Sequence, residues 1–396
     1  MTTRPNKTVF ALLAAFSSSI GLSAAPMVAI GDNAALFVTG VAGITYQDNV
    51  FRTQTNRTDD FFFRLQPGVE LQFGSQGAAS AALFASGEIL RYADQSGLNN
   101  ELLHLLLTAS LDEQVYQISF LASYDERSIN SLDRASEITD ASGIARDLND
   151  TAVQINGRYA FSNLTSVSAG LVFNRRDYND QGLAGSESFS VPVSLFYEVS
   201  PVLDARLGYQ WRKVDIIGSN DTFVDSYRDN HFTIGLVGEL GSPVFTGDLS
   251  VGWMERKFRG DIAMFPFANR KINSITYDVG VTYNATNSSY TLRLERDYMT
   301  SIFGGQNFSR SQVSVLGRFS LVPMWSATAM LGYSFSDYSN SDREQDDYFG
   351  RVGVHYTPNE YVRVSATISH NRVDGTGLQA SDYRANTFSV SASLRY

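Results

Sequence analysis

The chain ends with YRANTFSVSASLRY, residues Tyr383–Tyr396, and this stretch decides the fold. From Phe388 onward, apolar and polar residues alternate with a period of two, as on the two faces of a strand. One face carries Phe388, Val390, Ala392, Leu394 and Tyr396, and the other carries Ser389, Ser391, Ser393 and Arg395. A strand this regular at a chain end would leave a free edge that pairs with other molecules. Pairing with the first strand removes that edge, so the sequence predicts a closed β-barrel with this strand at its seam.

The composition of the whole chain supports the same class of fold. Aromatic residues make up 12% of the 396 residues, and the mean hydropathy is -0.14. After the N-terminal run, no segment approaches the ~18 consecutive apolar residues that a membrane helix needs. A membrane protein with near-neutral hydropathy must alternate apolar and polar residues, which is typical of transmembrane β-barrels. The pattern predicts a single all-β, antiparallel, up-and-down barrel.

The first residues predict a secreted protein. Arg4 and Lys7 precede an apolar run over residues 9–22, and Ser23 to Ala25 are small residues suited to cleavage. These features are typical of a secretory signal peptide. We therefore expect residues 1–25 to be the leader and residues 26–396 to form the barrel. A buried N-terminal helix is the alternative.

Cysteine content and charge exclude several classes of function. The chain has no cysteine, which excludes a disulfide framework and a thiolate metal site. Its formal net charge is -10, and phosphate binding along a nucleic acid needs a basic surface. No nucleic-acid partner is expected.

Alternating segments recur along the mature chain, after about ten loose residues. They predict strands at about 34–46, 61–73, 78–93, 100–111, 114–128, 150–161, 164–177, 187–199, 201–216, 227–240, 244–258, 270–284, 289–299, 307–321, 325–338, 346–356, 360–373 and 383–396. The count is about 18, within a range of 16 to 18, and bacterial single-chain barrels have even numbers. Most segments are longer than the ~9 to 11 residues that cross a bilayer, so we expect the wall to extend beyond the membrane.

The connections between these segments alternate between short and long. Short ones include 112–113, 162–163 and 200–201, whereas 47–59, 129–149 and 259–269 are long and polar. Outer-membrane barrels have short periplasmic turns and long extracellular loops. The parity therefore predicts the outer membrane of a Gram-negative bacterium, with both termini in the periplasm.

Aromatic residues gather near both ends of the predicted strands, where they suit the two membrane interfaces. Near the short turns lie Phe73, Tyr116, Phe161, Tyr197, Tyr283, Tyr290, Trp325, Tyr356, Tyr361 and Tyr396. Near the long loops lie Tyr46, Tyr92, Phe173, Trp211, Trp253, Tyr298 and Tyr338. These two sets are predicted to form the interfacial girdles.

The polar faces of the strands predict the inner wall and the candidate site. The candidate lumen-lining residues are Arg64, Glu70, Arg158, Arg206, Asp278, Arg293, Glu295, Arg318, Arg351 and Arg363. Charges of both signs inside a membrane protein need water or partners. They either contact a polar solute in a pore or pair across strands and fill the lumen. A barrel of about 18 strands is too wide for side chains alone to fill, which favours a conduit.

Catalytic and metal-binding alternatives have weaker signals. His231 lies near Ser226 and Asp229, and His370 lies near Asp374, which leaves an esterase or protease-like site open. His104 and His355 are expected to be hydrogen-bonded residues of the lumen. The acidic pairs Asp59-Asp60, Asp342 with Glu344, and Asp346-Asp347 offer oxygen ligands for Ca²⁺, but none matches the spacing of an EF-hand. No metal, no cofactor and no enzymatic activity are predicted.

One region of about thirty residues resembles a known family. Ile44–Phe51 reads ITYQDNVF, Asp59–Phe61 reads DDF and Leu65–Leu71 reads LQPGVEL. This order, with an Asp-Asn pair between aromatics and then a Pro-Gly strand, resembles the outer-membrane β-barrel porin family found with exopolysaccharide biosynthesis operons. The resemblance implies an outer-membrane exit for secreted polysaccharide. No functional residue is carried over from it.

These observations lead to an expected function, a non-enzymatic outer-membrane channel, with exported exopolysaccharide as its cargo. The alternatives are a general diffusion porin for small polar solutes, an outer-membrane hydrolase and a closed structural barrel. The expected partners are outer-membrane lipid and lipopolysaccharide, the barrel-assembly machinery, and polysaccharide or small polar solutes. Phe388 and Tyr396 resemble the C-terminal signal that this machinery recognises.

Overall fold

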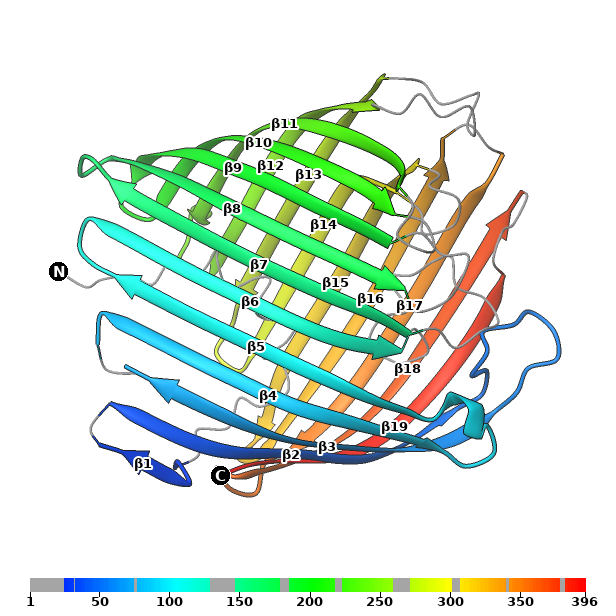
Figure 1. The fold of residues 1–396 in the computed structure, drawn as a ribbon. Coiled ribbons are helices and arrows are strands. Elements are labelled where there is room, and N and C mark those ends of the chain that lie inside the picture. Colours follow the sequence, from blue (N-terminus) through cyan, green and yellow to red (C-terminus); the bar gives the residue numbers. More distant parts are fainter. Residues whose placement is uncertain are drawn as a thin grey trace.

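The computed structural model describes residues 25–31, 33–74, 77–128, 147–178, 185–217, 223–258, 271–300, 307–339, 342–377 and 382–396. These residues form one antiparallel sheet that closes on itself into a barrel (Figure 1). The predicted signal peptide lies outside the described residues except for Ala25. No helix in the described part of the chain is long and apolar enough to span a membrane.

Eighteen strands build the wall, which confirms the predicted fold class and count. They are β2 (Ala34–Gln47), β3 (Asp60–Phe73), β4 (Ala79–Tyr92), β5 (Asn100–Asp112), β6 (Tyr116–Ser128), β7 (Asp147–Ala160), β8 (Thr165–Tyr178), β9 (Gly185–Ser200), β10 (Leu203–Ile217), β11 (Phe223–Glu239), β12 (Phe245–Phe258), β13 (Lys271–Asn284), β14 (Ser288–Thr300), β15 (Asn307–Val322), β16 (Trp325–Tyr338), β17 (Glu344–Tyr356), β18 (Val362–Thr376) and β19 (Tyr383–Arg395). Their lengths run from 13 to 17 residues, so the wall exceeds the ~9 to 11 residues that a bilayer requires.

The last strand closes the barrel, as the sequence predicts. β19 pairs antiparallel with β2, with Phe388 opposite Tyr46 and Leu394 opposite Gly40. The short strand β1 (Val28–Ile30) departs from the expectation of loose residues before the first strand. It pairs with Ala34–Leu36 of β2, beyond the end of β19, and so covers the stretch of edge that β19 leaves open. Three residues are too few to show a periodic pattern in the sequence.

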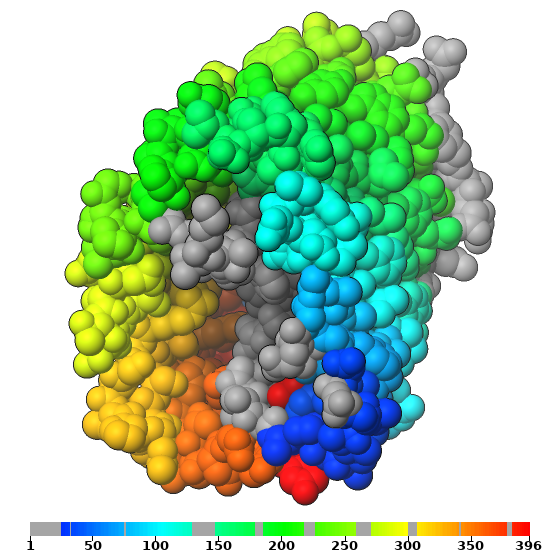
Figure 2. Space-filling view, turned by 90° about the vertical axis from the view of Figure 1, so that its left-hand side faces the viewer, coloured from blue at the N-terminus to red at the C-terminus, as the bar shows by residue number. Residues whose placement is uncertain are grey.

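Short turns and long connections alternate around the barrel, as predicted. Residues 201–202 and 323–324 connect strands at one rim, whereas residues 48–59 connect strands at the other. Both described ends of the chain lie at the short-turn rim (Figure 1). Figure 2 looks onto this rim and shows the strands as a ring around a central hollow.

The aromatic residues beside the short turns face outward. Phe161, Tyr197 and Tyr396 are each more than 50% exposed on the outside of the barrel, and most of the predicted set follows them. This placement confirms that the predicted set faces outward at the short-turn rim. Phe388 and Leu394 also face outward, and Arg395 faces inward and is buried.

The predicted girdle at the long-loop rim is wrong in three of its members. Trp253 faces outward and is 43% exposed, but Tyr92, Tyr298 and Tyr338 are at most 7% exposed. Tyr92 and Tyr338 fall on the inward positions of their strands and stack on inward phenylalanines, Tyr338 on Phe308 with ring centres 4.8 Å apart. Proximity to a loop does not show which face of a strand an aromatic occupies, because the side alternates with every residue.

An apolar cluster fills part of the inner wall at the long-loop rim. Its buried members are Val50, Phe62, Leu90, Tyr92, Leu98 and Leu102. Val50 belongs to the first long connection and is fully buried, so this connection packs against the inward side chains of β3, β4 and β5. The loop rim is therefore packed on this side.

Candidate functional site

The structure places the ten candidate residues on inward positions of the strands. Arg64 and Glu70 lie on β3, Arg158 on β7, Arg206 on β10, Asp278 on β13, Arg293 and Glu295 on β14, Arg318 on β15, Arg351 on β17 and Arg363 on β18. Cross-strand pairing brings two of them together, since Asp278 lies opposite Glu295. Their contacts divide them into four groups.

The first group forms ion pairs near the short-turn rim. Arg158 Nη2 lies 3.1 Å from Asp204 Oδ2, and its guanidinium covers the Phe196 ring. Arg206 donates two hydrogen bonds to Asp248, at 3.1 and 2.8 Å. Planar guanidinium and carboxylate groups match in such bidentate pairs, which fixes both side chains. These arginines are held by partners on the wall.

Glu70 forms a similar pair across the seam. Arg395 of β19 reaches over β2 and donates to both Glu70 oxygens, at 2.9 and 3.2 Å. The Arg395 guanidinium also lies 3.7 Å from the centre of the Phe37 ring on β2. Three strands are joined at the point where the sheet closes. The sequence places Arg395 on the polar face but does not reveal its partner.

The second group belongs to a charged network along β3 to β8. It contains Arg64, Glu88, His104, Asp125, Arg127, Asp150 and Arg176. His104 joins its two halves, because Nε2 lies 3.2 Å from Glu88 and Nδ1 lies 3.1 Å from Asp125. His355 contacts Ser365 at 2.9 Å and Thr328 at 3.2 Å. Both histidines are hydrogen-bonded residues of the inner wall, as predicted.

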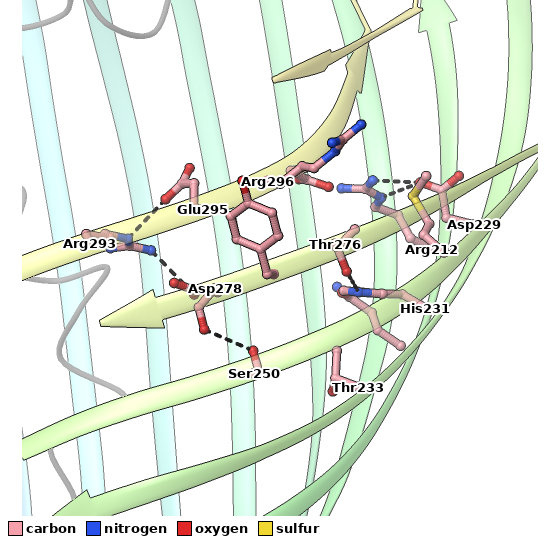
Figure 3. A pocket seen from close by; sticks show the side chains of 14 residues that line it. Arg212, Asp229, His231, Thr233, Ser250, Thr276, Asp278, Arg293, Glu295 and Arg296 are labelled. Atoms are coloured by element: carbon pink, nitrogen blue, oxygen red, sulfur yellow. Dashed lines mark hydrogen bonds and ion pairs between the residues drawn. The ribbon is translucent and has the colours of Figure 1, made fainter. Parts of the chain in front are cut away.

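A pocket of about 270 Å³ opens on the inner face of β10 to β14 (Figure 3). The third group, Asp278, Arg293 and Glu295, lines one side of it, and Arg293 lies 3.0 Å from Glu295 and 3.5 Å from Asp278. Arg212 and His231 line the other side. The side chains of Asp278, Arg293 and Glu295 are 54%, 48% and 40% exposed, so the pocket presents charges of both signs to the lumen.

The same pocket shows why the proposed hydrolase site does not form. His231 Nε2 lies 2.6 Å from the Thr276 hydroxyl, and Asp229 accepts hydrogen bonds from Arg212 and Arg256. Asp229 thus serves as the anion for two guanidinium groups and does not orient the imidazole. Arg256 is fully buried, and its guanidinium carbon lies 3.8 Å from the centre of the Tyr227 ring.

The second histidine pairing also fails to form. His370 Nδ1 lies 2.7 Å from Asn386 Oδ1, and both residues occupy outward positions. Asp374 accepts a hydrogen bond from Arg372 at 2.9 Å. Asp374 is therefore paired with Arg372 and does not orient His370.

Two of the three acidic pairs contain a carboxylate that accepts hydrogen bonds from the protein. Asp60 accepts backbone N–H groups from Phe61 and Gln95, and Asp347 accepts from Ser334 and Gln345. Among the described residues, no three acidic or histidine side chains come together as metal ligands.

The fourth group consists of Arg318, Arg351 and Arg363, on one side of the lumen. The strands that carry these arginines have few inward carboxylate side chains, because β15 has no Asp or Glu and Asp374 of β18 faces outward. Asp347 is the inward carboxylate of β17, and it is 1% exposed. Arg318 and Arg351 are exposed, and the neighbouring inward positions are rich in serine and threonine. This wall is positively charged and offers hydroxyl groups.

A wide, closed barrel with a charged inner wall defines the class of porin-type channels. The sequence matches a family model described as "Putative beta-barrel porin 2" over residues 39–396. The chain therefore belongs to this family, and the fold is that of an outer-membrane porin. The association of the family with polysaccharide operons is not part of this match.

Solved porin structures share the fold. OpdK from Pseudomonas aeruginosa superposes with a TM-score of 0.51 at 15% identity, covering 92% of this chain and 99% of that chain. OccAB4 from Acinetobacter baumannii gives 0.51 at 10% identity, covering 92% and 98%. OccK2 (OpdF) from P. aeruginosa, solved in complex with glucuronate, gives 0.52 at 11% identity, covering 91% and 97%. Comparison with curated protein sequences gives no significant match.

Proposed function

We propose that this protein is a passive, non-enzymatic channel for small polar solutes that prefers anions. The observation that carries the proposal is the wall of β15 to β18, where Arg318, Arg351 and Arg363 face the lumen and the carboxylates are buried or on the outside. A low-dielectric wall with one sign of charge concentrates ions of the opposite sign. The neighbouring serine and threonine hydroxyls supply hydrogen bonds that replace part of a solute's hydration.

Small solutes have more support from the inner wall than exported polysaccharide has. Sugar chains are held largely by exposed aromatic faces together with polar groups. Near the long-loop rim, Tyr92, Tyr298 and Tyr338 are almost fully buried, and the packed cluster around Val50 occupies part of the same rim. Arg293 and Asp278 are inward groups that remain accessible, and both are charged. Polysaccharide export is the alternative function, and the uptake experiment described below distinguishes it from a channel for small solutes.

The proposed orientation follows outer-membrane barrels in general. Short turns and both chain ends face the periplasm, and the long connections face the exterior. Cysteine substitutions at exposed Thr55, in the first long connection, and at partly exposed Ser242, in a short turn, would report the orientation by labelling in intact cells. We expect an impermeant maleimide to label position 55 and to leave position 242 unlabelled.

Solute uptake into liposomes tests the proposal. Purified protein is reconstituted, and swelling is followed with glucose, with its carboxylated analogue glucuronate, and with long polysaccharide from the host. We expect swelling with both small solutes, a faster rate for the carboxylate at equal osmolarity, and no block by polysaccharide. Block by polysaccharide together with slow uptake of both small solutes would favour the export channel.

A further inference from the structure

Four cations form a transverse row on the outer face of the barrel. Lys213 of β10 lies opposite Arg228 of β11, Arg228 lies opposite Lys257 of β12, and Lys257 lies opposite Lys271 of β13. The four side chains thus occupy one register line across four neighbouring strands, which lie side by side in Figure 1. Neighbouring strands lie about 4.8 Å apart, and like charges directly opposite each other destabilise a sheet. Anions bound between the four cations would reduce this repulsion.

The protein supplies only part of the countercharge. Asp215 binds Lys213 at 2.6 Å, and Glu255 bridges Lys257 and Lys271. The four cations of the row outnumber these two carboxylates by two. The side chains of Lys257 and Lys271 remain 56% and 51% exposed despite their ion pair, so both ammonium groups are accessible from outside.

Arg228 is the cation of the row without a carboxylate partner among the described residues. Its guanidinium carbon lies 5.9 Å from the centre of the Trp211 ring, and its Nε is buried without a hydrogen-bond partner. The aromatic ring fixes the guanidinium on the outer surface. Arg228 thus adds a positive charge to the outer face for which the described residues provide no carboxylate.

The position of the row along the strands identifies its environment. Toward the short-turn rim, the outward positions carry an aromatic layer that includes Trp211, Phe232 and Trp253. Beyond that layer come apolar residues, of which Ile234 is 68% and Val251 is 54% exposed. Aromatic belts mark the level of lipid headgroups. The row therefore lies just outside the apolar band, on the long-loop side, at the level of headgroup phosphates.

We propose that Lys213, Arg228, Lys257 and Lys271 form a binding site for phosphate groups carried by lipid of the outer leaflet, such as those of lipid A. The assignment to the outer leaflet rests on the proposed orientation, with long loops outside. The anion fits because it bridges adjacent cations and relieves their mutual repulsion, and because its acyl chains continue along the exposed apolar face below.

Lipid binding to purified protein in detergent tests this proposal independently of orientation and of transport. The double variant Arg228→Gln/Lys257→Gln removes two cross-strand cations of the row. The matched control Arg372→Gln/Arg384→Gln removes two outward cations that also lie opposite each other, on β18 and β19. We expect the first variant to bind lipid A about tenfold more weakly and the control to bind as the parent does, since each basic residue near an anionic lipid surface contributes modestly.

Three further arms complete the test. Lipid A without its phosphates should lose most of its binding to the parent protein, and inorganic phosphate at the same concentration should not compete. If the double variant fails to fold, as judged by its heat-modifiable mobility, the single variants Lys257→Gln and Lys271→Gln should each weaken binding. Equal loss in the row variant and the control, or retention of dephosphorylated lipid A, would overturn the proposal.

Discussion

Arg395 joins the first and last parts of the chain at the level of single side chains. It donates two hydrogen bonds to Glu70 and packs on the Phe37 ring, and the side chains of the pair are 10% and 19% exposed. Since the pair spans β19, β2 and β3, it acts where the barrel is closed by residues far apart in sequence. Hydrogen bonds to charged groups that are mostly shielded from water stabilise more than those on an open surface.

Replacing Arg395 by alanine should lower the free energy of unfolding by about 2 kcal/mol, because it removes two charge-assisted hydrogen bonds and leaves Glu70 partly buried. Urea unfolding in lipid vesicles measures the change. Arg372→Ala is the control, because Arg372 forms an ion pair on the outside with a side chain that is 57% exposed. We expect a change below about 0.5 kcal/mol there. Similar losses in both variants would show that the seam pair has no special role.

Asn49 belongs to the Asp-Asn pair on which the family resemblance rests, and its contacts give a physical reason for that pair. It is fully buried, and its Nδ2 donates to the carbonyl oxygens of Thr53 and Arg384, at 2.7 and 2.9 Å. Asp48 accepts the backbone N–H of Asn386 at 2.6 Å. The Asp-Asn pair therefore fastens the first long connection to the last strand, at the opposite end of the seam from Arg395.

Asn49→Ala should free this connection, because the carbonyl groups of Thr53 and Arg384 and the backbone N–H of Thr53 lose their side-chain partner. The expected cost is about 1 to 3 kcal/mol. We expect cleavage by an added protease between residues 50 and 58 to accelerate by about tenfold or more while the strands stay intact. Thr55→Ala, at an exposed position in the same connection, should leave the cleavage rate near that of the parent. An unchanged rate in Asn49→Ala would contradict the anchoring role.

At the scale of a secondary-structure element, β19 combines closure with a proposed role in assembly. Phe388, Leu394 and Tyr396 are outward and 42% to 51% exposed, whereas the inner side carries Arg395. The backbone N–H of Tyr396 donates to Val38 at 2.9 Å, so the final residue continues the ladder to β2. We propose that the outward aromatic end of this strand is what the barrel-assembly machinery recognises.

Deleting Tyr396 should reduce the amount of folded barrel in the outer membrane several-fold, since it removes the terminal aromatic and one step of the closing ladder. The folded fraction on a gel without heating measures assembly, and single-channel recording measures the molecules that do assemble. We expect the conductance of these molecules to stay near the parent value. Tyr361→Ala is a suitable comparison, because Tyr361 packs against Tyr396 with ring centres 5.4 Å apart but is not terminal. Normal assembly of the truncated chain would contradict the proposed signal.

At the scale of the whole molecule, most of the fold can be predicted from the alternation of apolar and polar residues along the strands. Strands of 13 to 17 residues repeat the two-residue period often enough to specify their positions, and the turn parity orders them. Three features could not be predicted from the alternation. β1 is too short to be periodic, and Tyr92 and Tyr338 lie inward where only an outward aromatic is expected. Side-chain partners such as Glu70 for Arg395 depend on closure of the ring, which no local pattern encodes.

The inward face that carries the candidate residues could be predicted, but the four kinds of contact that these residues make could not. Arg158 and Arg318 have the same residue type and the same alternation, yet Arg158 binds Asp204 and Arg318 lies on a strand without carboxylates. Which arginine faces an acid depends on the identity of residues two or more strands away. The anion-preferring wall therefore emerges only when all strands are placed.

Reversal potential across a planar bilayer with a KCl gradient tests the central claim most directly. The account predicts an open channel with anion selectivity, which the double variant Arg318→Glu/Arg351→Glu should abolish or reverse. The control Arg372→Glu/Arg384→Glu makes the same change of charge on the outer face and should keep the parent's sign. A parent channel that is closed at every voltage, or that prefers cations, would contradict the account, as would equal shifts in both variants.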